Sequence, residues 1–129
     1  MRRIVYISTA GGLPAAEIDQ LVAAAERNNF EREITGFLIY NGRNFLQLIE
    51  GPKAALMSLM ATLTRDSRHS GMLTLIDEPI TERSCPSWSM HRMRLSLDLA
   101  SRRSSIASEL PGPVSSHARH LVENFAALN

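Results

Sequence analysis

The chain has 129 residues, of which 44% are hydrophobic and 21% charged, as in an ordinary globular domain. A formal net charge of +1 gives no electrostatic reason to expect a nucleic-acid partner. The single cysteine, Cys85, excludes an internal disulfide framework, and no apolar run approaches the ~20 residues that cross a bilayer. We therefore expect a cytoplasmic protein that needs no signal peptide, membrane segment or metal ion.

The first half of the chain alternates between strand and helix patterns. Residues 2–8 form a β-rich run that ends before two glycines. Over residues 14–28, apolar side chains recur at i, i+3, i+4 and i+7, which predicts an amphipathic helix ended by an asparagine pair. Residues 34–40 and 44–50 are predicted strands, and the Asn-Gly dipeptide between them favours a hairpin because it adopts positive φ readily.

The second half begins with another helix and returns to strands. Pro52 suits the first turn of a helix whose apolar spacing continues to Leu63. Residues 72–76 and a segment around 87–93 are predicted to be the fourth and fifth strands. The order β-α-β-β-α-β-β predicts an α+β, ferredoxin-like sheet with two helices on one face.

The third strand is apolar on both of its faces, so both faces of the sheet need a cover. A last helical stripe near the C-terminus, with Val122 and Phe125 at its centre, can supply the second cover. We expect this C-terminal helical cap to pack on the sheet face that points away from the first two helices.

Gln47 is a polar amide in the middle of the apolar third strand. Its side chain shares parity with Phe45 and Ile49, and Tyr6 of the first strand is its expected neighbour. One interpretation is a structural pair in which the phenol donates to the amide oxygen. The other is a functional amide with a further partner.

Three more groups have both a structural and a functional interpretation. Asn28 and Asn29 can cap the first helix, or join Gln47 in a donor–acceptor array suited to a flat heterocycle with imide edges. Trp88 and Met90 flank Ser89 on the expected fifth strand, so they should share a face, either as core or at a ligand edge. The loop after the second helix contains Asp66, Arg68 and His69, and is either solvated or a cationic rim for phosphate or sugar.

Four blocks resemble BLUF domains, the blue-light sensors that use FAD, in their order and separation. The resemblance covers residues 2–93 and is most specific in the second block. The blocks are "IVYIS" at 4–8, "RNNFEREITGFLIYNGRNFLQLIEGP" at 27–52, "RDSRHS" at 65–70 and "WSM" at 88–90.

The resemblance assigns roles to the polar residues already described. It implies that Tyr6 is the photochemical electron and proton donor, and that Gln47 bridges Tyr6 and the N5/O4 edge of the flavin. It implies that Asn29 holds the carbonyl-and-imide side of the flavin, with Asn28 as its companion. Light-driven transfer from Tyr6 then lets the Gln47 amide rotate or tautomerise, which leaves the flavin facing a different hydrogen-bond pattern.

The remaining implied roles concern the ring faces, the ribityl side and the signal. Leu21 and Leu63 would sandwich the flavin ring between the two helices. Trp88 and Met90, with Ser89 between them, match the fifth-strand segment that relays the change. The loop that would line the ribityl and ring-edge side contains Asp66, Arg68 and His69.

We therefore expect a photoreceptor rather than an enzyme. Residues 1–93 would form the flavin-binding domain, and residues 94–129 a cap that relays the signal to a separate, unidentified protein or through a homo-oligomer, with no nucleic-acid or membrane partner. Three positions depart from the family pattern: Glu33 replaces a glycine, Cys85 a phenylalanine, and Thr62 a basic flavin contact.

Alternative functions on the same fold are distinguished by simple features. A flavin-free interaction module would remain colourless and refuse added FAD. An acyl-phosphate hydrolase would need an arginine in an anion-binding loop after the first strand, and residues 8–14 contain none. An RNA-binding sheet would present exposed aromatic residues, whereas only 5% of this chain is aromatic.

Overall fold

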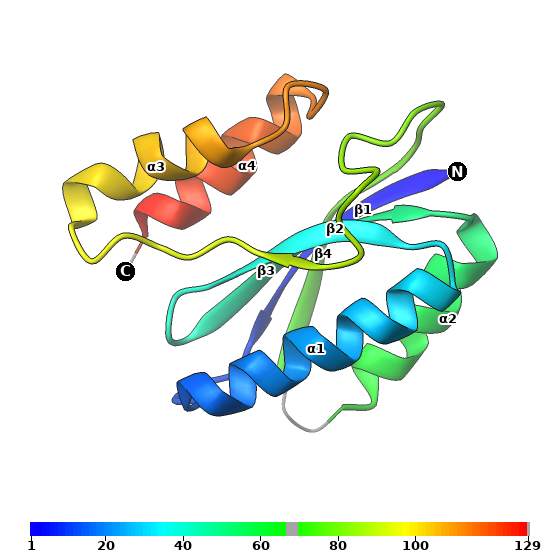
Figure 1. Cartoon of the computed structure of the whole chain (residues 1–129), viewed down its shortest axis with the longest axis horizontal. Helices are drawn as coiled ribbons and strands as arrows, with labels where there is room; N and C mark the ends of the chain where they lie inside the picture. Colours follow the sequence, from blue (N-terminus) through cyan, green and yellow to red (C-terminus); the bar gives the residue numbers. More distant parts are fainter. Residues whose placement is uncertain (67–69, 129) are drawn as a thin grey trace.

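Five strands form one sheet in the order β4-β1-β3-β2-β5 (Figure 1). The computed structural model describes residues 1–66 and 70–128. Strands β1 to β4 pair antiparallel with their neighbours, and β5 lies parallel to β2 at the edge. The strands are β1 Arg2–Thr9, β2 Thr35–Tyr40, β3 Asn44–Gly51, β4 Ser70–Pro79 and β5 His91–Arg92.

The helices lie in two pairs, one on each side of the sheet (Figure 1). Helices α1 and α2 cover one face, and α3 and α4 cover the other after a short 3₁₀ turn, η1. The predicted α+β, ferredoxin-like sheet with a helical cap on its second face is therefore confirmed. The bounds are α1 Ala15–Glu31, α2 Lys53–Thr64, η1 Leu99–Ser101, α3 Arg102–Glu109 and α4 Ser116–Ala127.

The alternation of side chains along β3 explains why both faces are covered. Phe45 and Ile49 pack in the core beneath α1 and α2, whereas Leu46 and Leu48 pack in the core beneath the cap. All four side chains are buried. Because β3 is the central strand of the sheet, neither face of it can be left to solvent.

Helix α1 extends beyond its predicted end. It continues through the asparagine pair to Glu31, so neither Asn28 nor Asn29 is its C-cap. The chain instead turns at Glu33, whose φ of 60° lies in the left-handed region. This conformation explains why glycine suits the position, because a side chain is strained there.

Helix α3 was not predicted, because its sequence has almost no apolar stripe. Only Ile106 among its residues is buried. It is held by packing against α4 rather than by an amphipathic pattern of its own.

The fifth strand is shorter than predicted, and this changes the positions of two candidate residues. Only His91 and Arg92 pair with β2, so residues 88–90 precede the strand. The prediction that Trp88 and Met90 share a face is wrong: Trp88 packs against the cap-side core, and Met90 is buried in the core beneath α1 and α2. The chain bends there, so strand alternation does not apply.

Candidate functional site

Two adjoining hollows lie between the sheet and helices α1 and α2. Their empty volumes are about 390 and 660 Å³, and Leu21, Ala25, Gln47 and Leu63 line both. The first hollow is completed by side chains of the sheet, Tyr6, Leu38 and Phe45. The second opens along the helix ends and is completed by Ala24, Asn28, Asn29, Arg32, Leu59, Thr62 and Asp66.

Gln47 lies where the two hollows meet. Its cross-strand partners are Tyr6 on β1 and Leu38 on β2, so the predicted neighbour is in place. The amide Nε2 donates to the Met90 thioether sulfur at 3.6 Å, which is a weak acceptor. Among the buried side-chain nitrogen and oxygen atoms of the described residues, Gln47 Oε1 alone has no hydrogen-bond partner.

This orphan oxygen does not fit the structural interpretation of Gln47, in which the amide is satisfied by Tyr6. A satisfied pair would have used the phenol of Tyr6 to complete the amide, and Oε1 receives no such bond. An acceptor buried without a partner costs about 1–3 kcal/mol. A polar atom retained at that cost beside a hollow is explained by a ligand that supplies the missing donor.

Tyr6 is enclosed in the sheet next to this amide. Its side chain is buried, and burial raises the pKa of the phenol above its ordinary value. The phenol is therefore neutral in the folded protein at physiological pH and keeps its proton available for donation. Because it also lines the first hollow, a ring bound there would lie close to it.

Asn29 connects the second hollow to the segment before β5. Its side chain is buried, and Nδ2 donates to the backbone oxygen of Ser89 at 2.9 Å. Asn28, one residue earlier, is exposed and lines the second hollow. The two asparagines and Gln47 thus converge on one site, as the sequence suggested, although Asn29 is also tied to residue 89.

The apolar residues expected to hold a ring are in suitable positions. Leu21 on α1 and Leu63 on α2 are partly buried and line both hollows from opposite helices. Asp66 lines the second hollow at the end of α2. Arg68 and His69, the other two residues expected in this rim, lie outside the described residues.

Several site residues were not identified from the sequence. Ala25 and Phe45 line the first hollow. The available signal was their spacing: Ala25 lies four residues after Leu21 on a helix, and Phe45 lies two residues before Gln47 on a strand. Arg32 also lines the second hollow, and no sequence pattern distinguished it from a surface arginine. The contact between Met90 and Gln47 depends on the bend before β5, which has no signature in the sequence.

The residues present fit an isoalloxazine ring. The lining of the two hollows has the character of a small-molecule site, which is mostly apolar with a few placed polar groups. Leucine side chains on two helices offer apolar faces for a flat ring. Amides at one edge offer both donors and acceptors, and the unsatisfied oxygen of Gln47 needs a donor.

A ferredoxin-like sheet that holds such an amide-lined apolar site beneath two helices has the architecture of a flavin-binding sensor domain. The family profile described as "BLUF: Sensors of blue-light using FAD" matches residues 1–91. The chain belongs to the BLUF family, whose cofactor is FAD.

Solved structures with the same fold include two BLUF proteins. The dark-state structure of the BLUF protein BlrB has a TM-score of 0.76 and 34% sequence identity, over 98% of this chain and 96% of that one. Klebsiella pneumoniae BlrP1 with FMN and cyclic diGMP has a TM-score of 0.84 and 28% identity, over 98% of this chain and 34% of that one.

Curated relatives are much longer than this chain. The blue light- and temperature-regulated antirepressor BluF of Escherichia coli (strain K12) is 33% identical over 63 residues, 49% of this chain and 16% of that protein. Photoactivated adenylate cyclase subunit alpha of Euglena gracilis is 31% identical over 129 residues, 97% of this chain and 12% of that protein. Within the described part of this chain, no helix is long and apolar enough to cross a membrane.

Proposed function

We propose that this chain is a non-enzymatic light switch in which Tyr6 and Gln47 convert absorption of blue light into a change of hydrogen bonding. The observation that carries the proposal is the buried Gln47 Oε1, which lacks a partner beside the hollow that Tyr6 also lines. Bound FAD supplies light absorption and an electron acceptor. The residues that would hold FAD are Leu21, Asn28, Asn29, Leu63 and the rim residues Asp66, Arg68 and His69.

The protein side of the switch follows from the chemistry of an amide. Tyr6 would give up an electron and its phenolic proton to the bound FAD, with Gln47 as the group through which the proton passes, and both would return to Tyr6 to complete the cycle. The two ends of a glutamine amide have nearly the same shape but opposite hydrogen-bond polarity. Exchange of those ends therefore alters the bond to Met90, where Nε2 now donates to sulfur at 3.6 Å. No covalent bond to FAD is needed, so the cycle is reversible.

Contacts around residues 88–91 support a route from Gln47 to the cap. Met90 touches Gln47 on the α1/α2 side, whereas the Trp88 ring packs edge-on against Phe37 on the cap side, with centroids 6.2 Å apart. The Trp88 ring also lies 4.4 Å from the ring of His91. His91 Nε2 is 2.8 Å from Glu109 Oε2 on α3. A displacement that starts at Met90 would thus reach Trp88 through the backbone of residues 88–90, and the cap through the contacts of Trp88 and His91.

This route gives the two parts of the chain distinct roles. Residues 1–93 form the flavin-binding unit, and residues 94–129 form the cap that carries the signal to a separate partner or to a second copy of the chain. The relatives include a light-regulated antirepressor and a photoactivated adenylate cyclase subunit. An effector of this general kind, on another polypeptide or on a further part of the same one, would receive the signal.

A visible spectrum before and after blue light tests the proposal. The purified protein should be yellow, and illumination should shift its flavin absorption to the red and relax in darkness, because the rearranged amide makes a stronger bond to the flavin carbonyl. A folded protein that stays colourless and refuses added FAD would instead be the flavin-free interaction module. A yellow protein with no reversible shift would contradict the assigned switch.

A further inference from the structure

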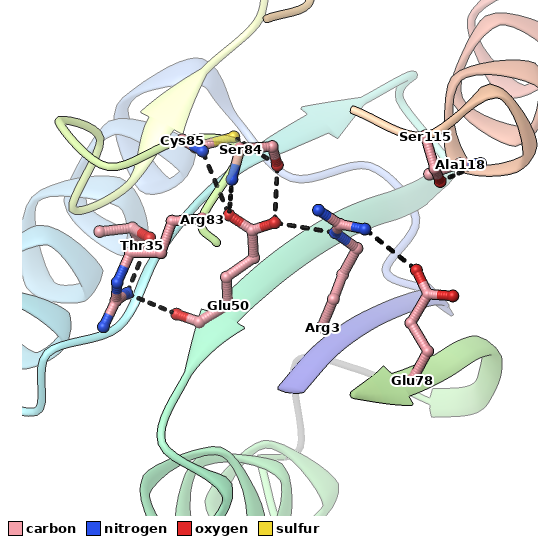
Figure 2. Close-up of polar contacts among 9 residues, drawn as sticks. All are labelled: Arg3, Thr35, Glu50, Glu78, Arg83, Ser84, Cys85, Ser115 and Ala118. Carbon is pink, nitrogen blue, oxygen red and sulfur yellow. Dashed lines mark hydrogen bonds and ion pairs between the residues drawn. The ribbon is translucent and has the colours of Figure 1, made fainter. Parts of the chain in front are cut away.

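A buried charge cluster holds the start of the segment that leads to Trp88 and Met90 (Figure 2). Glu50, at the end of β3, is fully buried. Its Oε2 accepts bonds from Arg3 Nε at 2.8 Å and from the Ser84 hydroxyl at 2.6 Å. Its Oε1 accepts bonds from the backbone N–H groups of Ser84 at 2.8 Å and Cys85 at 3.1 Å. One carboxylate thus receives four hydrogen bonds.

Residues 84–90 have no helix or strand of their own and depend on such individual contacts. We call these residues the 84–90 segment. Glu50 binds its start, and the Gly36 N–H donates to the Trp88 oxygen at 2.8 Å near its end. The last residue, Met90, accepts from Gln47. Both ends of the segment therefore contact β3. The contacts are made by Glu50 at one end and Gln47 at the other, which lie three residues apart and so on opposite faces of the strand.

The side chains of this cluster are chemically inert, so their role is structural. Burial alone would lower the pKa of the Arg3 guanidinium, but its bond to Glu50 and the charge of Glu50 offset this, so the pKa is raised. Burial also raises the pKa of the Cys85 thiol to about 11, so the thiol is neutral and unreactive. A buried ion pair is often no more stabilising than apolar packing, and its best-attested use is to fix one arrangement.

We propose that Glu50 is a positioning residue that holds residues 84 and 85 against β3, so that a rearrangement at Gln47 moves only the far end of the 84–90 segment, at Trp88 and Met90. The inference rests on the proposed function, because it assumes that Gln47 rearranges. With its start fixed by charge-assisted bonds, the segment transmits a change at Met90 to Trp88. With its start released, the whole segment shifts and Trp88 responds little.

The sequence provides a specific reporter for this test, because Trp88 is the single tryptophan of the chain. The experiment compares Glu50→Gln with the wild-type protein, both loaded with FAD. It records the light-induced shift of flavin absorption and the light-induced change in Trp88 fluorescence. The amide of the variant keeps one oxygen acceptor and loses the other, so it cannot hold both N–H groups and Arg3.

Glu50→Gln should keep the flavin shift but reduce the light-induced change in Trp88 fluorescence several-fold, because it removes the charge-assisted bond that holds the start of the segment. Glu78→Gln is the matched control. Glu78 is half-exposed and also accepts from Arg3, at 3.0 Å, but this bond does not involve the 84–90 segment. Glu78→Gln should keep both the flavin absorption shift and the change in Trp88 fluorescence, as should any substitution that affects only stability.

A full Trp88 response in Glu50→Gln would overturn the proposal. An equal loss of that response in Glu78→Gln, or loss of the flavin shift in Glu50→Gln, would also overturn it.

If Glu50→Gln does not fold, Ser84→Ala tests the proposal instead, because it removes the hydroxyl bond and leaves the pair of Glu50 with Arg3. It should weaken the Trp88 response by about threefold with the flavin shift intact, and an unchanged response overturns the proposal. Failure of the proposed function is distinct, since the wild-type protein would then show no flavin shift.

Discussion

The two faces of the sheet are packed in different ways. On the cap side, four of the 12 residues of α4 are buried. On the other side, two of the 17 residues of α1 and one of the 12 residues of α2 are buried, although both helices carry apolar stripes. The cap packs on the sheet like an ordinary core, whereas α1 and α2 leave room above it. The second arrangement suits a face whose packing is completed by a flat ligand.

The two faces also differ in how completely their buried polar side chains are hydrogen-bonded. On the cap side, both oxygens of Glu50 are bonded, and the charge has a partner in Arg3. On the side of α1 and α2, the Gln47 amide is left with an unsatisfied oxygen. A fully bonded group defines one arrangement, whereas an incompletely bonded amide is able to change its partners. The fixed and the changeable parts of the molecule are therefore on opposite faces of β3.

The largest expected effect comes from removing the phenol on the α1/α2 side. Tyr6→Phe should leave the protein yellow, because the ring faces of the hollow are unchanged, but abolish the reversible red shift, because the donor is gone. Absorption spectra before and after blue light measure this. The chain has one other tyrosine, Tyr40, whose hydroxyl donates to the Ala10 oxygen at 2.6 Å. Tyr40→Phe should keep the shift, and a full shift in Tyr6→Phe would refute the donor role.

Matched truncations test the difference in packing directly. Ile106 of α3 is fully buried, so Ile106→Ala should lower the free energy of unfolding by about 2–5 kcal/mol. Leu63 of α2 is only partly buried beside the hollows. In the flavin-free protein, Leu63→Ala should cost less than about 1 kcal/mol, because much of that side chain is already unpacked.

Urea unfolding of both variants, with and without FAD, gives the comparison. Leu63→Ala should weaken FAD binding by about tenfold, since it removes one apolar face of the ring site, whereas Ile106→Ala should change the affinity little. Equal stability losses at the two positions in the flavin-free protein would contradict the view that only the cap side is fully packed.

The sequence predicted the parts of the fold that depend on regular periodicity. The alternation along residues 44–50 and the hairpin before it set the register, which brings Gln47 opposite Tyr6. The positions of Trp88 and Met90 were not predictable in this way. They depend on a bend that is held by Glu50, Gly36 and other distant residues, and local pattern carries no record of such contacts.

The smallest expected effect concerns the turn between the two differently packed regions. Glu33 links α1 to β2, and its carbonyl accepts a bond from Arg83 Nη2 at 2.7 Å, from the loop before the 84–90 segment. Glu33→Gly relieves the strain of a side chain at φ 60° and keeps this carbonyl, although glycine also loosens the unfolded chain. We expect thermal unfolding to show a stabilisation of about 0.5–1 kcal/mol.

The control is Glu31→Gly, at the end of α1. It should lower the free energy of unfolding by up to about 1 kcal/mol, because glycine is a poor helix former. A loss of stability in Glu33→Gly would mean that the Glu33 side chain contributes more than its backbone conformation costs.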